Sequence, residues 1–291
     1  MSQTPRISTE FYPIYIPKPD VFAGPDGPTL RAGQVYDDWI PNDHTFVRAP
    51  DGRWHVFGIT GPNSPIIHEA EWQAFHIVSP TTSLADAMTA GPWEELPKLL
   101  TPAERPGEPH EFWAPFVMEG EGAYHMFYGP TEMRSVVSTD LAEWTPRGVA
   151  FTQEGAARDP WLVRMGGLYY MVYVAGESVW LRTSRDLVAW SETPVEIFPM
   201  RRPGAPESPM MIEMDGAFYL FWTIHDGTHG NWDHRTFVFR SDRPDDFREA
   251  EEVAMLDAHA PELVRDADGE WFISSVEWPI RGVSLARLAW E

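Results

Sequence analysis

The sequence contains no cysteine, which excludes disulfide bonds, thiolate metal sites and cysteine nucleophiles. Basic residues are scarce: 22 Lys and Arg stand against 44 Asp and Glu, which gives a formal net charge of −22 at pH 7. A nucleic-acid surface needs clustered Lys and Arg, and an anionic membrane surface repels an acidic protein. We therefore expect neither a nucleic acid nor a membrane as a partner. Oligomeric state leaves no signal in the sequence.

Long apolar runs are also missing, since none approaches the roughly 18 residues of a membrane-spanning helix. The stretch MSQTPRISTEFYPIYIPKPD at the N-terminus has one early Arg and several prolines but no apolar run, unlike a signal peptide. The expectation is a cytoplasmic protein, unless a leader has been removed. The 291 residues are enough for one large domain or two small ones.

Proline, glycine and aromatic residues are plentiful. The 28 Pro and 22 Gly are spread along the chain and disfavour long helices, whereas the 14 Trp, 16 Phe and 9 Tyr favour strands. We expect an all-β protein, with residues 83–90 as the best short helix. Tryptophan at this density suits sugar-binding clefts, because flat sugar faces stack on indoles, although most of these side chains are expected to pack in the core.

One pattern recurs five times along the chain. Each copy has a polar start, an apolar strand, a Gly-containing turn and an aromatic-rich strand, which together predict a β-hairpin. The copies are 42–61, 112–129, 158–176, 207–223 and 259–278. A Ser–Asp–aromatic turn follows three of them, at 138–144, 184–190 and, more loosely, 241–247.

The later copies start about 45 to 53 residues apart, which fits four-stranded propeller blades of roughly 40–50 residues. The first interval is longer and predicts an insertion near 62–75 or 80–110. We therefore predict a single-domain, five-bladed β-propeller over residues 36–291. Residues 1–35 would wrap it, or close a blade with the strand near 283–290. A β-sandwich has no reason to repeat one motif five times.

The innermost strands of a propeller converge on its axis, so the residues that open the repeats become neighbours. They are Asp43, the Trp113-Ala114-Pro115 turn, Asp159, Glu207 and His259. Three of the five positions carry carboxylates, which repel one another and raise one another's pKa. Glycoside hydrolysis needs such a group: one carboxylate attacks or activates water, and a protonated one gives its proton to the leaving oxygen. Glu is the natural acid, since its intrinsic pKa is the higher.

The succession NDH, WAP, RDP, ESP and HAP resembles the five-bladed glycoside hydrolases of families 43, 32, 62 and 68, across roughly residues 36–280. The resemblance implies that Asp43 is the base or nucleophile, that Asp159 stabilises the transition state and orients the acid, and that Glu207 is the general acid.

The choice among these families rests on small differences. NDH resembles the family 32 nucleophile motif, but His44 stands where Pro is usual there, and ESP resembles the acid motifs of families 32 and 43 equally. WAP and HAP look more like family 43, which we prefer. Family 43 enzymes invert, with Asp43 as base on a water, whereas family 32 enzymes retain, with Asp43 as nucleophile. Carboxyl separations of about 6.5–9.5 Å and about 5–5.5 Å distinguish the two outcomes.

Further residues flank the predicted catalytic positions. Candidates for stacking on a sugar are Trp39, Trp113 and Trp161, each of which could equally pack between blades. Arg158 would contact the sugar or pair with an acid, and His44 would bind substrate in the deepest subsite. The polar loop 225–234 would shape specificity through His225, His229 or Trp232.

His259 has two interpretations, a hydrogen-bonded structural histidine or a neighbour of an axial ion. The family 43 resemblance implies the second, with a structural calcium or sodium on the axis and His259 beside it. No cofactor is expected to be required, and no zinc motif of the HExxH type is present.

The leading hypothesis is a glycosidase that removes terminal arabinofuranosyl, xylosyl or fructosyl units from short oligosaccharides. Transglycosylation and retaining hydrolysis of fructan or sucrose-type substrates are alternatives on the same scaffold. Phosphorolysis is disfavoured, because Arg158 is the one obvious anion ligand among the start motifs. A non-catalytic, lectin-like propeller would need aromatic residues at the axis but not three carboxylates.

Overall fold

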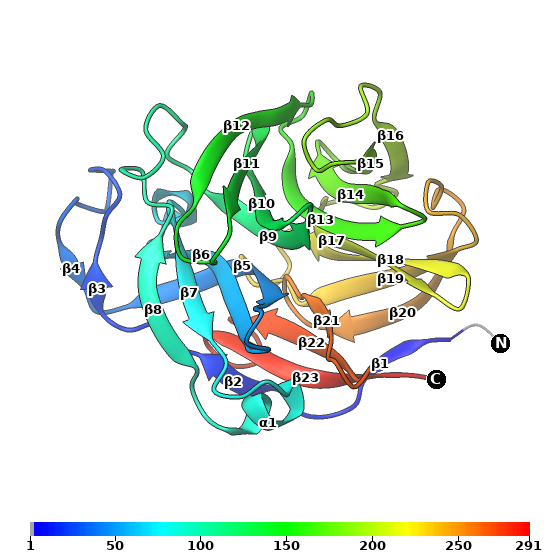
Figure 1. The fold of residues 1–291 in the computed structure, drawn as a ribbon, viewed down its shortest axis with the longest axis horizontal. Helices are drawn as coiled ribbons and strands as arrows, with labels where there is room; N and C mark the ends of the chain where they lie inside the picture. The colour runs from blue at the N-terminus through cyan, green and yellow to red at the C-terminus, as the bar shows by residue number, and fades with distance from the viewer. Residues whose placement is uncertain (1–2) are drawn as a thin grey trace.

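The computed structural model describes residues 3–291 and shows five β-sheets arranged around a central axis (Figure 1). Each sheet is one blade built of antiparallel neighbours, and successive blades follow one another around the ring in chain order. The predicted five-bladed β-propeller is therefore confirmed. No helix within residues 3–291 has the length and apolar character needed to cross a membrane.

The first three blades form the left side and the top of the ring in Figure 1. Blade 1 contains β5 (Trp39–Arg48), β6 (Trp54–Pro62), β7 (Gln73–Val78) and β8 (Glu94–Leu99). Blade 2 contains β9 (Trp113–Gly120), β10 (Ala123–Gly129), β11 (Glu132–Ser138) and β12 (Thr145–Thr152). Blade 3 contains β13 (Arg158–Met165), β14 (Leu168–Ala175), β15 (Ser178–Ser184) and β16 (Val195–Pro199).

The last two blades bring the chain back to its start. Blade 4 contains β17 (Ala205–Met214), β18 (Ala217–His225), β19 (Arg235–Ser241) and β20 (Glu251–Asp257). Blade 5 contains β21 (Leu263–Arg265), β22 (Trp271–Val276), β23 (Val283–Trp290), β1 (Pro5–Ile7) and β2 (Tyr12–Tyr15). Strands from both ends of the chain thus share a sheet: Pro5 pairs with Trp290, and Tyr12 with Leu285. This pairing covers the edge of β23 and closes the ring.

The long first interval of the repeat reflects several insertions around blade 1. The helix α1 (Leu84–Thr89) lies between β7 and β8, as predicted for 83–90, and Ser83 caps it by accepting a hydrogen bond from Asp86 N. A short 3-10 helix, η1 (Ile67–Glu69), lies between β6 and β7. The hairpin of β3 (Asp20–Val21) and β4 (Val35–Tyr36) forms a separate two-stranded sheet and precedes the first repeat, so it does not contribute to the long interval.

The recurring Ser–Asp turns join the third and fourth strands of blades 2 and 3. Ser138 accepts a backbone N–H from Asp140, and the Asp140 carboxylate accepts two further N–H groups. Ser184 and Asp186 repeat the arrangement in blade 3. The looser third copy differs, because Ser241 donates to the carbonyl oxygen of Asp246. Side-chain bonds to nearby backbone groups favour turns over strands, which explains why the repeat stops pairing there.

Aromatic and aliphatic side chains fill the space between neighbouring blades. Phe116 of blade 2 packs against Trp161 of blade 3, with ring centroids 5.6 Å apart. Trp222 of blade 4 is fully buried and packs against Phe198 of blade 3, with ring centroids 5.5 Å apart. Each such side chain stabilises the fold by about 1.5–3 kcal/mol through burial, so the Trp-rich composition is largely a property of the core.

Candidate active site

The inner strand of every blade starts with an irregular turn, and this turn carries the site. Hydrogen-bonded pairing slips between Pro41 and His44 in blade 1, and at the same place in blades 3 and 4. The middle residue of the motif has a positive φ in four blades: Ala114 (44°), Asp159 (54°), Ser208 (48°) and Ala260 (40°). A proline follows each of these four residues. The bulge bends the strand and turns its first side chains toward the axis, a backbone strain typical of functional sites.

A cavity of about 300 Å³ opens where these turns meet. Asp43 in β5, Asp159 in β13 and Glu207 in β17 all line it, although they are far apart in the sequence. The ring therefore brings together the three carboxylates that the repeat pattern singled out. One cation, Arg158, lines the same cavity, with its Nε 3.5 Å from Asp159 Oδ2.

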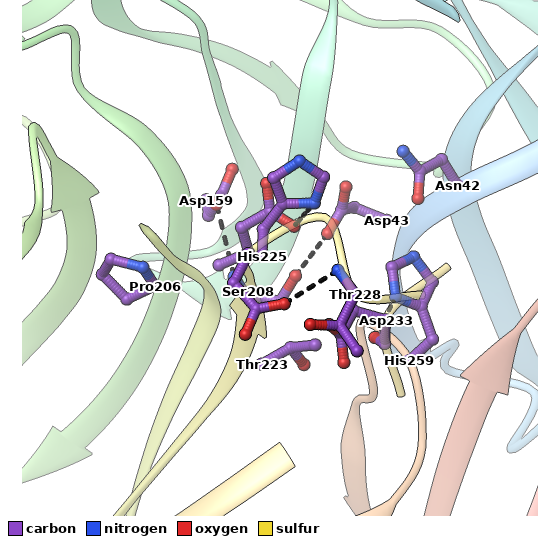
Figure 2. Close-up of polar contacts among 12 residues, drawn as sticks. Asn42, Asp43, Asp159, Pro206, Ser208, Thr223, His225, Thr228, Asp233 and His259 are labelled. Atoms are coloured by element: carbon purple, nitrogen blue, oxygen red, sulfur yellow. Dashed lines mark hydrogen bonds and ion pairs between the residues drawn. The ribbon is translucent and has the colours of Figure 1, made fainter. Parts of the chain in front are cut away.

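Ser208 connects the carboxylates of Asp43 and Asp159. Its hydroxyl donates to Asp43 Oδ1 at 2.6 Å, and its backbone N–H donates to Asp159 Oδ2 at 3.2 Å. Figure 2 shows the Ser208 side chain between the two aspartates, with Asn42 beside Asp43 and His259 on the same side of the view as Asn42. The two acids are thus held by different donors, one a hydroxyl and one a backbone amide.

Burial and mutual repulsion shift the titration of all three acids. Burial first, and then the charge of Asp159, raise the pKa of Asp43, while the hydrogen bond from Ser208 opposes that rise. Burial raises the pKa of Asp159, and Arg158 opposes it. Burial, followed by the charges of Asp159 and Asp43, raises the pKa of Glu207 to about 8. Glu207 therefore holds its proton at neutral pH, as a general acid must, while 30% of its side chain stays exposed to the opening.

Four further predicted residues also line the cavity: Trp113, Arg158, His225 and His259. The Trp113 ring lies 4.8 Å from the ring of His68 and forms an aromatic wall. His225 Nδ1 is 3.8 Å from Glu207 Oε2, so the two side chains share one side of the opening.

Three other predicted sugar-binding residues lie elsewhere. Trp39 is 1% exposed and Trp161 is 7% exposed, because both fill the core, and Trp161 Nε1 donates to the buried Glu262 carboxylate at 3.2 Å. His44 is also buried, with Nε2 2.7 Å from Ser274 Oγ, and lines a separate axial cavity of about 20 Å³. Trp39 and Trp161 therefore follow the packing alternative and not the stacking one, and the expectation that His44 binds substrate is corrected.

Loop 225–234 contributes differently from its prediction. Asn231, rather than Trp232, lines the cavity, while the Trp232 ring stands edge-on to His259 at 5.3 Å. Trp232 therefore supports a lining residue and is not itself on the cavity wall.

Sequence reasoning missed a fourth carboxylate in the cavity, Glu71. It is 5% exposed and lies in the insertion between β6 and β7. Its Oε1 accepts from Asn42 Nδ2 at 2.9 Å, and its Oε2 is 2.9 Å from His68 Nδ1, a contact that raises the pKa of His68. The long first interval indicated an insertion here, but no repeated motif marks Glu71 itself.

The donor set gives limited support for the predicted axial ion. His259 Nδ1 lies 2.6 Å from the carbonyl oxygen of Asp233, and its buried Nε2 has no hydrogen-bond partner. Across residues 3–291, no group of three or more His, Asp or Glu side chains converges to hold a metal. The protein thus offers one free nitrogen rather than a set of ligands, and a calcium or sodium ion beside His259 stays a prediction.

Comparisons with known proteins agree with this geometry. The sequence profile of Glycosyl hydrolases family 43 matches residues 152–289, slightly less than half of the chain, which include Asp159 and Glu207. A search of curated proteins gives no match.

Solved structures with the same architecture are numerous, although their sequences have diverged. A Bacillus subtilis arabinanase has a TM-score of 0.64 at 13% identity, covering 86% of this chain and 94% of its own. An α-L-arabinofuranosidase from Clostridium thermocellum has a TM-score of 0.64 at 14% identity, covering 84% and 88%. A Xanthomonas citri family 43 enzyme complexed with xylotriose has a TM-score of 0.64 at 16% identity, covering 86% and 87%.

The fold, the cavity and the profile match together define the protein as a glycosidase built on a five-bladed β-propeller. Among the propeller hydrolases, it resembles glycoside hydrolase family 43, the family that the WAP and HAP motifs favoured.

Proposed function

We propose that the protein hydrolyses terminal arabinofuranosyl, xylosyl or fructosyl units of short, neutral oligosaccharides. Asp43 is the general base, Asp159 stabilises the transition state and Glu207 is the general acid. The observation that carries the proposal is the meeting of these three acids, from three blades, in one cavity where Glu207 has a pKa of about 8. The resemblance to family 43 supports the same roles.

The reaction follows from the charge state of each group. Glu207 gives its proton to the glycosidic oxygen while the bond from that oxygen to the anomeric carbon breaks. Asp43 accepts a proton from the water that attacks the anomeric carbon from the opposite face, so the configuration inverts. Asp159, beside Arg158, places a negative charge near the oxocarbenium-like transition state. After the products leave, Asp43 releases its proton to solvent and Glu207 takes one up through its exposed edge, which restores the starting charge states.

The walls of the cavity support action at chain ends on neutral sugars. A volume of about 300 Å³ is at the small end of ligand sites and suits one sugar unit with part of the next. The lining holds four acidic side chains, Asp43, Glu71, Asp159 and Glu207, against one arginine, and Glu207 alone is proposed to carry a proton as the acid. Uronic acids and sugar phosphates would be repelled by this charge, whereas the Trp113 wall offers a surface for stacking.

The test combines a substrate panel with variants of the proposed acid. Nitrophenyl α-L-arabinofuranoside, nitrophenyl β-D-xyloside, the matching oligosaccharides and sucrose-type substrates would be assayed with wild type and Glu207→Gln. Loss of general-acid catalysis should lower kcat/KM by about 10²–10⁴ on oligosaccharides. The loss should be much smaller on nitrophenyl glycosides, whose leaving group needs little protonation.

Glu213→Gln is the matched control, because Glu213 lies on the same strand, β17, and is exposed. It should keep wild-type activity, and proton NMR of the first product should show the inverted anomer. Sugar binding without turnover on any substrate would contradict the proposal and favour a lectin-like protein. Equal activity of Glu207→Gln and wild type would contradict the role of Glu207.

A further inference from the structure

Ser208 is placed where it can control the proposed base without touching the sugar. It follows Glu207 directly, yet its own polar groups bind the other two acids: Oγ binds Asp43 Oδ1 at 2.6 Å, and the backbone N–H binds Asp159 Oδ2 at 3.2 Å. Ser208 lines the small axial cavity below the site rather than the main cavity. Its polar contacts are thus with the proposed catalytic acids, and its side chain is not part of the main cavity wall.

The repeats show that this turn does not need a hydroxyl in order to fold. Ala114 in blade 2 and Ala260 in blade 5 occupy the equivalent position, each with a positive φ and each followed by proline. Ser208 has the same backbone conformation, with a φ of 48°. The Ser208 hydroxyl in blade 4 is therefore not required for the turn conformation.

We propose that Ser208 is the positioning residue of the general base: its hydroxyl holds Asp43 Oδ1, directs Oδ2 toward the attacking water and favours the ionised carboxylate. This inference rests on the function proposed above and adds a residue to it.

The surroundings of Asp43 show why such a donor matters. Four other acidic side chains lie near Asp43: Glu71, Asp159, Glu207 and Glu262. Glu207 keeps its proton at neutral pH and burial raises the pKa of Glu262, so the charges that act on Asp43 are those of Asp159 and Glu71. The cavity also holds Arg158, which pairs with Asp159, and two histidines that contact acids, His68 beside Glu71 and His225 beside Glu207. Two buried histidines, His44 and His259, complete the titratable groups, and burial lowers their pKa values. Within residues 3–291, Ser208 is the one side chain that donates a hydrogen bond to Asp43. A donor to the charged form opposes both burial and repulsion, which favour the protonated form.

The hydrogen bond also fixes the orientation of the carboxylate. Rotation about the terminal bond of an aspartate is broad and roughly two-fold, so a free carboxylate samples many orientations. With Oδ1 held by Ser208, Oδ2 is the oxygen left to accept the proton from water. Small displacements of a catalytic group reduce rates strongly, so a fixed orientation contributes to kcat rather than to substrate binding.

The experiment is the pH profile of kcat/KM for Ser208→Ala and Ser208→Gly, measured on a substrate that the wild type hydrolyses. Both variants lose the hydroxyl but keep the backbone N–H to Asp159, and Gly also relieves the positive φ. Removing a hydrogen bond to a charged group should raise the pKa of Asp43, and so move the acidic limb upward, by about one pH unit. At pH values below the acidic limb of the wild type, kcat/KM of both variants should be about tenfold lower than that of the wild type. KM should stay close to the wild-type value.

A matched control separates this effect from general loss of a hydroxyl. Ser178 Oγ donates to Glu196 Oε1 at 2.7 Å in blade 3, outside the cavity. Ser178→Ala removes a similar hydroxyl–carboxylate bond and should leave the acidic limb unchanged. A uniform loss of activity at every pH in both Ser208 variants, with the limb at its wild-type position, would overturn the inference.

A second measurement does not depend on turnover. Carboxyl ¹³C resonances of aspartate-labelled protein can be titrated, with the signal of Asp43 identified by its absence from Asp43→Asn. That signal should titrate about one unit higher in Ser208→Ala than in wild type. An unchanged titration would overturn the inference even if hydrolysis is confirmed. If the wild type hydrolyses no substrate but the Asp43 signal still titrates higher in Ser208→Ala, the proposed function is contradicted and the role of the Ser208 hydrogen bond is not.

Discussion

Replacing Glu207 with glutamine should stabilise the folded protein, and the gain should increase with pH. Burial and the charges of Asp159 and Asp43 raise the pKa of Glu207 from 4.5 to about 8. The unfolded chain then releases this proton near pH 4.5, whereas the folded chain keeps it until about pH 8. Between these values the folded state binds more protons, so wild-type stability falls as pH rises. The glutamine side chain of the variant has no charge to bury, so the variant escapes this loss.

The size of the effect can be bounded from the pKa shift. At 1.36 kcal/mol per unit, the full shift corresponds to about 5 kcal/mol above pH 8. Because 30% of the Glu207 side chain stays exposed, solvent screens much of that penalty, and we expect about 1–2 kcal/mol. For a chain of this length, 1 kcal/mol changes Tm by about 2–4 °C. The variant should therefore melt roughly 2–8 °C higher at pH 8.5, and close to wild type at pH 5.

Thermal unfolding of wild type, Glu207→Gln and the surface control Glu213→Gln at pH 5, 7 and 8.5 would measure this difference. Glu213 is exposed on the same strand, so its replacement should change Tm little at any pH. A Tm gain that is equal at pH 5 and pH 8.5 would refute the electrostatic reasoning, since it would arise from packing. A variant less stable than wild type at pH 8.5 would refute it as well.

Two further substitutions test neighbouring parts of the site. Glu71→Gln should move the acidic limb of the pH–rate profile downward by less than about one unit, because Glu71 raises the pKa of Asp43, Asp159 and Glu207; an upward shift in the measured profile would contradict this direction. Trp161→Phe should lower the free energy of unfolding by about 1–3 kcal/mol, measured by urea denaturation, because it leaves the buried Glu262 without its indole donor. Unchanged stability would show that Glu262 needs no such partner.

The architecture was predictable because its signals are local and repeated. Each hairpin has its own Gly turn, and the Ser–Asp turns at 138–144 and 184–190 form the same hydrogen bonds in blades 2 and 3. The regular spacing of these units predicts a ring, and the ring places the starts of the repeats around one axis. Asp43, Asp159 and Glu207 meet for that reason, with no further information needed.

Which further side chains line the cavity depends on contacts between blades and on strand register, and no local sequence pattern encodes these. Trp113 lines the cavity whereas Trp161 packs in the core, although both occupy the start of an inner strand. The difference is one of register, since Trp113 precedes the bulge and Trp161 follows it. Glu71 lines the cavity from an insertion, and the repeat pattern does not predict where the side chains of an insertion point.

The bulged turn explains how the propeller can hold several buried acids that lower its free energy of unfolding. Proline and the positive φ fix the backbone at Ala114, Asp159, Ser208 and Ala260, whatever their side chains. Blades 2 and 5 use alanine there, so the polar groups of blades 3 and 4 are additions to a turn that forms without them. Repulsion among the buried acids then lowers stability without deciding the local fold. Substitutions to alanine at Asp159 and Ser208 should for this reason preserve the architecture, and activity lost in them reports on chemistry rather than on folding.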